Sequence, residues 1–130
     1  MPGRPREGTF FHRFLRYWLP ALAYVTLIIT LSAQPHLKPP LDFRFADKLA
    51  HLVEYGVLGA LLVRALRGTL RLRLAFAAAL LAIAIGALIG AGDEYFQGFV
   101  PGRESSVLDW MADVAGITLA QMVYALAVRR

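Results

Sequence analysis

Residues 72–91 read LRLAFAAALLAIAIGALIGA, and this stretch decides the fold class. It carries one charged side chain, Arg73, and otherwise contains only Ala, Leu, Ile, Phe and Gly. A helix rises about 1.5 Å per residue, so about twenty residues span a hydrocarbon core of about 30 Å. The stretch therefore predicts a transmembrane helix. Apolar residues also make up 58% of the 130-residue chain, more than a small soluble domain can bury.

Three more apolar stretches give the chain four predicted helices. They cover about residues 17–33, 47–66, 72–91 and 107–128. The first follows several arginines, as in a signal peptide. A cleavage site after Ala33 would need a small residue at the position that Leu31 occupies. We therefore expect a retained anchor helix and an all-α, integral membrane four-helix bundle. Residues 1–130 are predicted to form a single domain, with residues 1–14 flexible.

Lysine and arginine are unevenly distributed between the two ends of the predicted bundle. Ten of the 14 lie in the N-terminal segment, in the loop between the second and third helices, or at the C-terminus. The other four are Lys38, Arg44, Lys48 and Arg103. Because basic residues stay on the cytoplasmic side, this asymmetry predicts that the N- and C-termini are both cytoplasmic.

The acidic residues show the opposite distribution. Only Glu7 of the nine lies at the predicted cytoplasmic end. The other eight, on or near the outer side, are Asp42, Asp47, Glu54, Asp93, Glu94, Glu104, Asp109 and Asp113. Ordinary solubilising charge would not segregate so completely. Several of these acids also lie within the predicted helices, where a charge costs about 3 kcal/mol unless it is paired or functional.

Helical spacing places these polar residues on inward-facing surfaces. In the second predicted helix, Asp47, His51, Glu54 and Tyr55 fall within an arc of about 100°. In the third, Asp93 and Gln97 share a stripe with a small-residue pair, and in the fourth Asp109 and Asp113 do the same. The two pairs are Gly86/Gly90 and Gly116/Ala120. Small residues four apart let membrane helices approach closely, so the polar residues are predicted to point into the bundle.

Three motifs open or close the predicted helices at the outer side. They are Asp47-Lys-x-x-His51-x-x-x-Tyr55-x-x-Leu58-Gly59, Asp93-Glu94-x-x-Gln97-x-Phe99-x-Pro101-Gly102-Arg103, and Ser106-x-x-Asp109-x-x-x-Asp113-x-x-Gly116. Together they resemble the VanZ-like family of small bacterial membrane proteins, over roughly residues 15–125. The chain departs from the family pattern in having Asp113 where Asn is usual and Ala120 where Gly is frequent.

The resemblance implies a four-pass protein of the bacterial cytoplasmic (inner) membrane. The family is named for a protein associated with low-level resistance to the glycopeptide teicoplanin, which implies a role at the cell envelope. The family name supplies no reaction. The chemistry must therefore be argued from the residues themselves.

The first interpretation is an outward-facing pocket that binds a polar head group or a cation. Arg103 offers a bidentate contact to phosphate, and a divalent cation could bridge carboxylates to it. The expected partners are a membrane lipid and a lipid-linked cell-wall precursor. The predicted binding residues are Asp47, Lys48, His51, Glu54, Tyr55, Asp93, Glu94, Gln97, Arg103, Asp109 and Asp113.

The second interpretation is a metal-assisted or acid–base membrane enzyme that acts on a lipid phosphate. The candidate catalytic residues are His51, Asp93 and Glu94, and the candidate metal ligands are His51, Glu54, Asp93, Glu94 and Asp113. The absence of cysteine excludes thiolate sites. Residues 90–93 match the Gly-x-Gly-Asp pattern of intramembrane aspartyl proteases, but the Tyr-Asp pair of those enzymes is missing.

The third interpretation is a structural network that fixes helix register in a membrane interaction protein. Against it, eight acids face only four bases at the outer side, and an unpaired buried carboxylate is costly. Nucleic-acid binding is not expected, because the basic residues are scattered over three short segments. Glycine-rich faces could also serve a homo-oligomer. The sequence leaves these three interpretations open.

Overall fold

A computed structural model describes residues 7–39, 41–70 and 75–128. These residues form four helices: α1 (Glu7–Ser32), α2 (Ala46–Thr69), α3 (Ala75–Gln97) and α4 (Val107–Val128). Each helix contains a segment long and apolar enough to cross a membrane, and the described part of the chain has no strand. The all-α, four-helix prediction is confirmed.

Two helix boundaries differ from the prediction by more than three residues. Helix α1 begins at Glu7, ten residues before the predicted start, and no proline lies between Glu7 and Pro20. Residues 1–6 lie outside the described residues, as does the predicted start of the third helix at Leu72. Helix α3 continues past residue 91 to Gln97, so its last turns carry charged and polar side chains.

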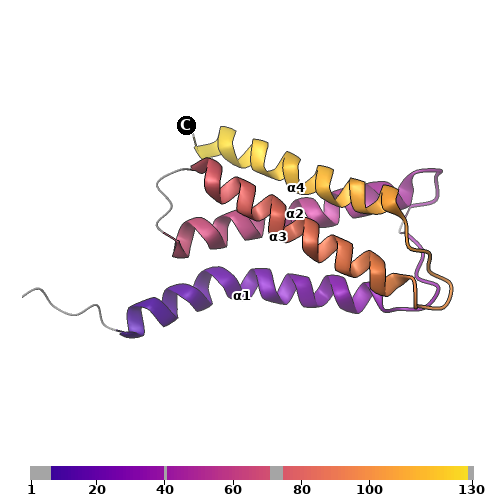
Figure 1. The fold of residues 1–130 in the computed structure, drawn as a ribbon, viewed down its shortest axis with the longest axis horizontal. Coiled ribbons are helices and arrows are strands. Elements are labelled where there is room, and N and C mark those ends of the chain that lie inside the picture. The colour runs from indigo at the N-terminus through magenta and orange to yellow at the C-terminus, as the bar shows by residue number, and fades with distance from the viewer. Residues whose placement is uncertain (1–6, 40, 71–74, 129–130) are drawn as a thin grey trace, which may run out of the picture.

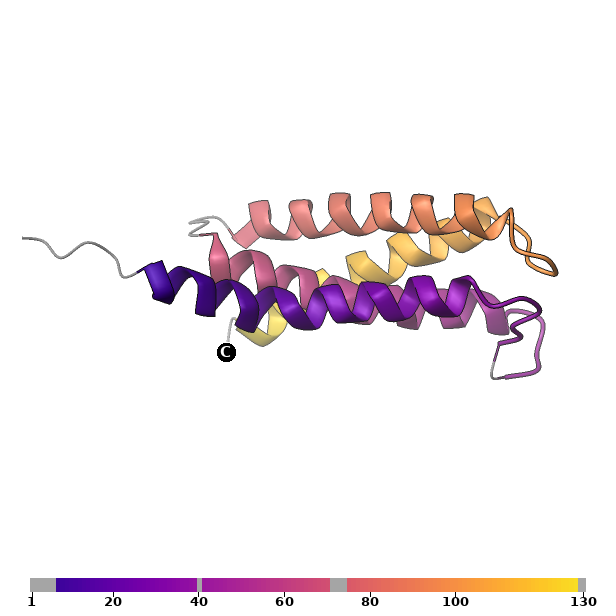
Figure 2. The same cartoon turned by 90° about the horizontal axis from the view of Figure 1, so that it is seen from below.

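The four helices run up and down, and both ends of the described chain lie at one end of the bundle (Figure 1). The loops 33–45 and 98–106 lie together at the opposite end, as Figure 2 also shows. We call this the two-loop end. Helix α2 is central and packs against the other three helices. In the membrane-spanning windows, 44% of α2 is buried but only 11% of α1.

An apolar core fills the middle of the bundle and apolar side chains also cover its outside. Tyr55, Leu58 and Ile117 are fully buried in the core. Phe76 and Leu88 are 72% and 75% exposed on α3. An outer surface this apolar fits lipid rather than water.

Glycines set the close approach of the helices. A Cβ atom at Gly116 of α4 would overlap the backbone carbonyl of Leu52 in α2. A Cβ atom at Gly59 would lie 2.9 Å from Ile117 Cα, and one at Gly90 would lie 3.0 Å from Asp113 Oδ2. The glycine faces that the spacing predicted are therefore occupied by helices of the same chain. Gly86, Gly90 and Gly116 are buried and Ala120 is half-buried.

Candidate functional site

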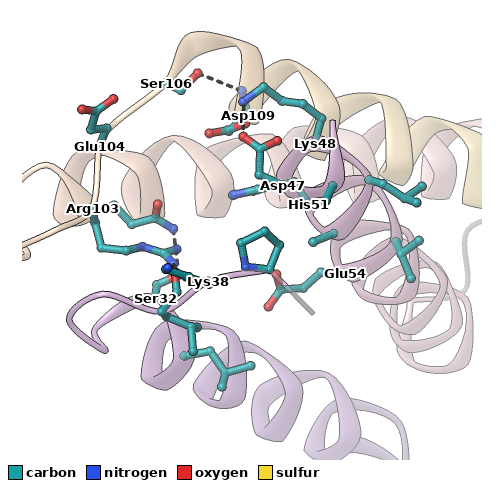
Figure 3. Close-up of a pocket in the computed structure, with 18 of the residues that line it drawn as sticks. Ser32, Lys38, Asp47, Lys48, His51, Glu54, Arg103, Glu104, Ser106 and Asp109 are labelled. Carbon is teal, nitrogen blue, oxygen red and sulfur yellow. Dashed lines mark hydrogen bonds and ion pairs between the residues drawn. The ribbon is translucent and has the colours of Figure 1, made fainter. Parts of the chain in front are cut away.

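A cavity of about 740 Å³ lies at the two-loop end, and residues of all four helices and both loops line it. Three cationic side chains line it: Lys38, Lys48 and Arg103. Four carboxylates also line it: Asp47, Glu54, Glu104 and Asp109. Figure 3 shows Arg103, Lys38 and Ser32 grouped on one side, and Asp47, Lys48 and Asp109 on the other. Side chains of both signs of charge thus line the cavity.

The loop 98–106 positions Arg103 by a tight turn. The backbone N–H of Arg103 donates to the carbonyl of Val100 at 3.1 Å, and Gly102 has a φ of 76°. Proline at the second position and a positive φ at the third are typical of a type II turn. Pro101 also accepts a hydrogen bond from the backbone of His36 at 3.3 Å, which ties the two loops together. The turn directs Arg103 into the cavity wall, where Arg103 Nη1 donates to the carbonyl of Leu37 at 3.1 Å.

Asp93 is the centre of a hydrogen-bonded network that joins α1, α2 and α3. Its Oδ2 atom accepts from Ser32 Oγ at 2.8 Å, from Gln97 Nε2 at 3.3 Å and from Tyr55 OH at 3.4 Å. Gln97 Nε2 also donates to Ser32 Oγ at 3.0 Å. All four side chains are buried. These hydrogen bonds compensate the burial of the Asp93 carboxyl.

A second network joins α2, α3 and α4 around His51. His51 Nδ1 is hydrogen bonded to Asp113 Oδ1 at 2.8 Å and lies 3.8 Å from Glu94 Oε1. Glu94 Oε2 accepts a hydrogen bond from the backbone N–H of Ser106 at 2.8 Å. Asp113 is fully buried and Glu94 is 5% exposed. Adjacent acids on α3 therefore belong to different networks, because neighbouring helical side chains point about 100° apart.

Lys48 bridges two carboxylates at the mouth of the second network. Its Nζ atom lies 2.6 Å from Asp47 Oδ2 and 2.5 Å from Asp109 Oδ1. Asp109 is buried, whereas Lys48 and Asp47 are partly exposed. Helix α4 starts here, where the N–H of Asp109 donates to Ser106 Oγ at 3.4 Å. Serine before the first turn is a favoured N-cap residue.

The structure divides the predicted binding residues into two groups. Seven line the cavity: Asp47, Lys48, His51, Glu54, Gln97, Arg103 and Asp109. The other four, Tyr55, Asp93, Glu94 and Asp113, are buried behind them. Of the predicted metal ligands, His51 and Glu94 come together with Asp109. One ligand atom from each lies within 4.8 Å of the others. Glu54, Asp93 and Asp113 do not belong to that group.

Sequence reasoning left several cavity residues out of the predicted site. They are Tyr24, Ser32, Lys38, Glu104 and Ser106. Tyr24 OH donates to the carbonyl of Glu54 at 3.2 Å, across from α1 to α2. Ser32 is the last residue of α1, whose residues 17–32 carry no charge, and its partner Asp93 is 61 residues away. Only the folded arrangement reveals these contacts.

A comparison with protein families identifies the chain. The family model described as VanZ/LLP1 matches residues 7–128. The chain belongs to the VanZ/LLP1 family. Together with the four apolar helices, this makes it a VanZ-like, four-pass membrane protein. No curated protein and no solved structure matches the chain.

Proposed function

We propose that the cavity at the two-loop end binds the phosphate head group of a membrane lipid or of a lipid-linked cell-wall precursor. The observation that carries the proposal is the pair Arg103 and Lys38 on one wall of the cavity. Neither forms an ion pair with a carboxylate among the described residues, whereas Lys48 is engaged by Asp47 and Asp109. An arginine fork and a lysine ammonium suit a phosphate group.

The apolar part of the cavity supports a lipid ligand over a free phosphate. Leucine and valine side chains from α1, α2 and the first loop line it: Leu31, Leu37, Leu41, Leu49 and Val53. Leu49 and Val53 are also 42% and 55% exposed on the outer face of α2. The cavity is therefore continuous with a surface that suits lipid chains. A bound lipid would place its phosphate at Arg103 and its first chain carbons against these residues.

We infer further that the two-loop end lies outside the cytoplasm of a bacterial cell, with the protein in the inner membrane. This orientation follows from the excess of basic residues at the opposite end. It would expose the cavity to the outer leaflet, where lipid-linked cell-wall precursors are used. A role in teicoplanin resistance would follow if the bound lipid is such a precursor.

The orientation can be tested by cysteine labelling, because the chain has no cysteine of its own. Ser105 and Leu70 are both exposed, in the loop 98–106 and just after α2 respectively. In intact spheroplasts, Ser105→Cys should react with a membrane-impermeant maleimide, and Leu70→Cys should react only after lysis. The opposite labelling pattern would show that the cavity faces the cytoplasm.

Head-group binding can be tested with the full chain in lipid nanodiscs and undecaprenyl phosphate as the probe. Loss of a charge-assisted contact costs about 1.5–3 kcal/mol, so Arg103→Ala should raise the Kd by about 10- to 100-fold. Arg64→Ala is the matched control, because Arg64 stacks on Tyr17 toward the other end of the bundle. Inorganic phosphate should compete weakly. Equal Kd values for the wild type and Arg103→Ala would refute the proposal.

A metal-assisted or acid–base reaction on the same lipid phosphate is the second candidate function. It is favoured by the proximity of His51, Glu94 and Asp109, of which His51 and Asp109 line the cavity. The test is release of inorganic phosphate from a lipid phosphate by the purified protein. Turnover that survives both His51→Ala and Glu94→Gln would argue against these residues as the catalytic groups.

A further inference from the structure

Three ligand groups converge beside the cavity: His51 and Asp109 line it, and Glu94 is buried behind them. His51 of α2, Glu94 of α3 and Asp109 of α4 each offer one nitrogen or oxygen atom, and these atoms lie within 4.8 Å of one another. Ligands that share one transition-metal ion at bond lengths of about 2.0–2.3 Å lie about 3–4.5 Å apart. A small inward movement of the side chains would therefore bring the three atoms to bonding distance.

The Glu94 carboxyl has an oxygen without a hydrogen bond. Glu94 Oε2 accepts from the Ser106 backbone, but Glu94 Oε1 is buried and accepts no hydrogen bond from a described residue. It lies 3.8 Å from His51 Nδ1, so the free oxygen is beside the imidazole ring of the cluster. An unsatisfied buried carboxylate oxygen is costly and calls for a ligand. A cation bound among the three side chains would satisfy it.

A second carboxylate holds the His51 ring in place. Asp113 Oδ1 is hydrogen bonded to His51 Nδ1 at 2.8 Å, and Asp113 is fully buried. Histidine ligands of metals characteristically hydrogen bond to a carboxylate through the ring nitrogen that does not bind the metal. Asp113 is therefore in the place of an orienting residue, which leaves His51 Nε2 as the nitrogen for a metal. Asp113 is not one of the three clustered groups.

From these contacts we propose that His51, Glu94 and Asp109 form a binding site for a divalent transition-metal ion of the Zn²⁺ or Mn²⁺ type. One imidazole with two carboxylates suits Zn²⁺ or Mn²⁺ better than Ca²⁺ or Mg²⁺, which prefer ligand sets made only of oxygen atoms. Because His51 and Asp109 line the cavity, the open coordination positions of the ion would face it. The metal site does not depend on the head-group proposal, and its test uses the metal alone.

Lys48 gives the proposal a distinctive consequence. Its Nζ atom lies 2.5 Å from Asp109 Oδ1, so the ammonium competes with a metal ion for this carboxylate. Asp47, at 2.6 Å from the same Nζ atom, can keep the lysine when a metal displaces it. Removal of the Lys48 charge should therefore strengthen metal binding.

The test is isothermal titration calorimetry. The full chain is purified through a tag that contains no histidine, freed of metal, and titrated with Zn²⁺ in detergent. The wild type should bind one ion per chain. Glu94→Gln should raise the Kd by at least about tenfold, since ligand-shell changes cost 10- to 100-fold in affinity. Lys48→Met should lower the Kd by about tenfold, because it removes a like charge within about 4 Å.

Asp93→Asn is the matched control for Glu94→Gln. It removes the same charge one residue away on the same helix, but Asp93 belongs to the Ser32–Gln97 network. Its Kd for Zn²⁺ should stay close to that of the wild type. Equal losses in the two variants, or no saturable binding in either the wild type or Lys48→Met, would overturn the metal site. The Lys48→Met result decides the question if Glu94→Gln does not fold.

Discussion

Gly116→Ala is expected to destabilise the bundle by about 3 kcal/mol, toward the upper end for overpacking a core. The added methyl group would overlap the carbonyl oxygen of Leu52, and it would lie 3.0 Å from the backbone nitrogen of Gly56. Backbone atoms within a helix cannot rotate away as a side chain can. Helices α2 and α4 would therefore have to separate along their whole contact. Thermal unfolding in detergent, followed by circular dichroism, measures the effect.

Gly92→Ala is the control for this substitution. A Cβ atom at Gly92 meets no heavy atom within 4 Å, and Gly92 also lies inside a helix. Alanine is better than glycine in a helix by up to about 1 kcal/mol, so this variant should be unchanged or slightly more stable. Equal destabilisation by the two substitutions would show that α2 and α4 do not cross at Gly116 as described.

The second large effect is expected at the buried pair of His51 and Asp113. His51→Leu leaves a fully buried carboxylate without its hydrogen bond at 2.8 Å, which should cost about 3–5 kcal/mol of stability. Asp113→Asn should be nearly neutral by comparison, because the amide oxygen can still accept a hydrogen bond from the imidazole. The VanZ-like pattern has Asn at this position, which fits that expectation.

A double-mutant cycle isolates the contribution of the pair. The variant His51→Leu with Asp113→Leu removes both polar groups at once and should recover part of the loss. The cycle compares the wild type, His51→Leu, Asp113→Leu and the double variant. We expect a coupling free energy of about 2 kcal/mol from their chemical unfolding in detergent. Additivity to within about 0.5 kcal/mol would contradict the contact. The result also tests the interpretation of these residues as a structural network. A large coupling shows that the network stabilises the bundle whether or not it binds a ligand.

The sequence was sufficient to predict the helices, because the length and apolar composition of each stretch are local properties. Residues 72–91 alone indicate a membrane helix, and the Gly86/Gly90 spacing predicted the face that packs in the bundle. The sequence predicted an end near residue 91 for the third helix, whereas α3 continues to Gln97. Asp93 and Gln97 are polar, yet they continue the helix because their side chains are satisfied by distant partners.

The composition of the candidate site was predicted better than its arrangement. The sequence analysis placed Asp93 and Glu94 in the same predicted binding pocket, but the fold separates them into two networks. Nothing local indicates that Lys38, in a proline-rich loop, lines the same cavity as Arg103, because loop conformation depends on contacts such as that between His36 and Pro101. Contacts between side chains of different helices are tertiary, and the residue pattern of a single sequence does not predict them.

The central claim is that the cavity at the two-loop end holds a lipid phosphate. The most direct measurement is an experimental structure of the protein extracted in its native lipid. The proposal predicts phosphate density within hydrogen-bond distance of the Arg103 guanidinium, with a chain leading toward Leu49 and Val53. A cavity that contains only water, with Arg103 still donating to the carbonyl of Leu37, would contradict it.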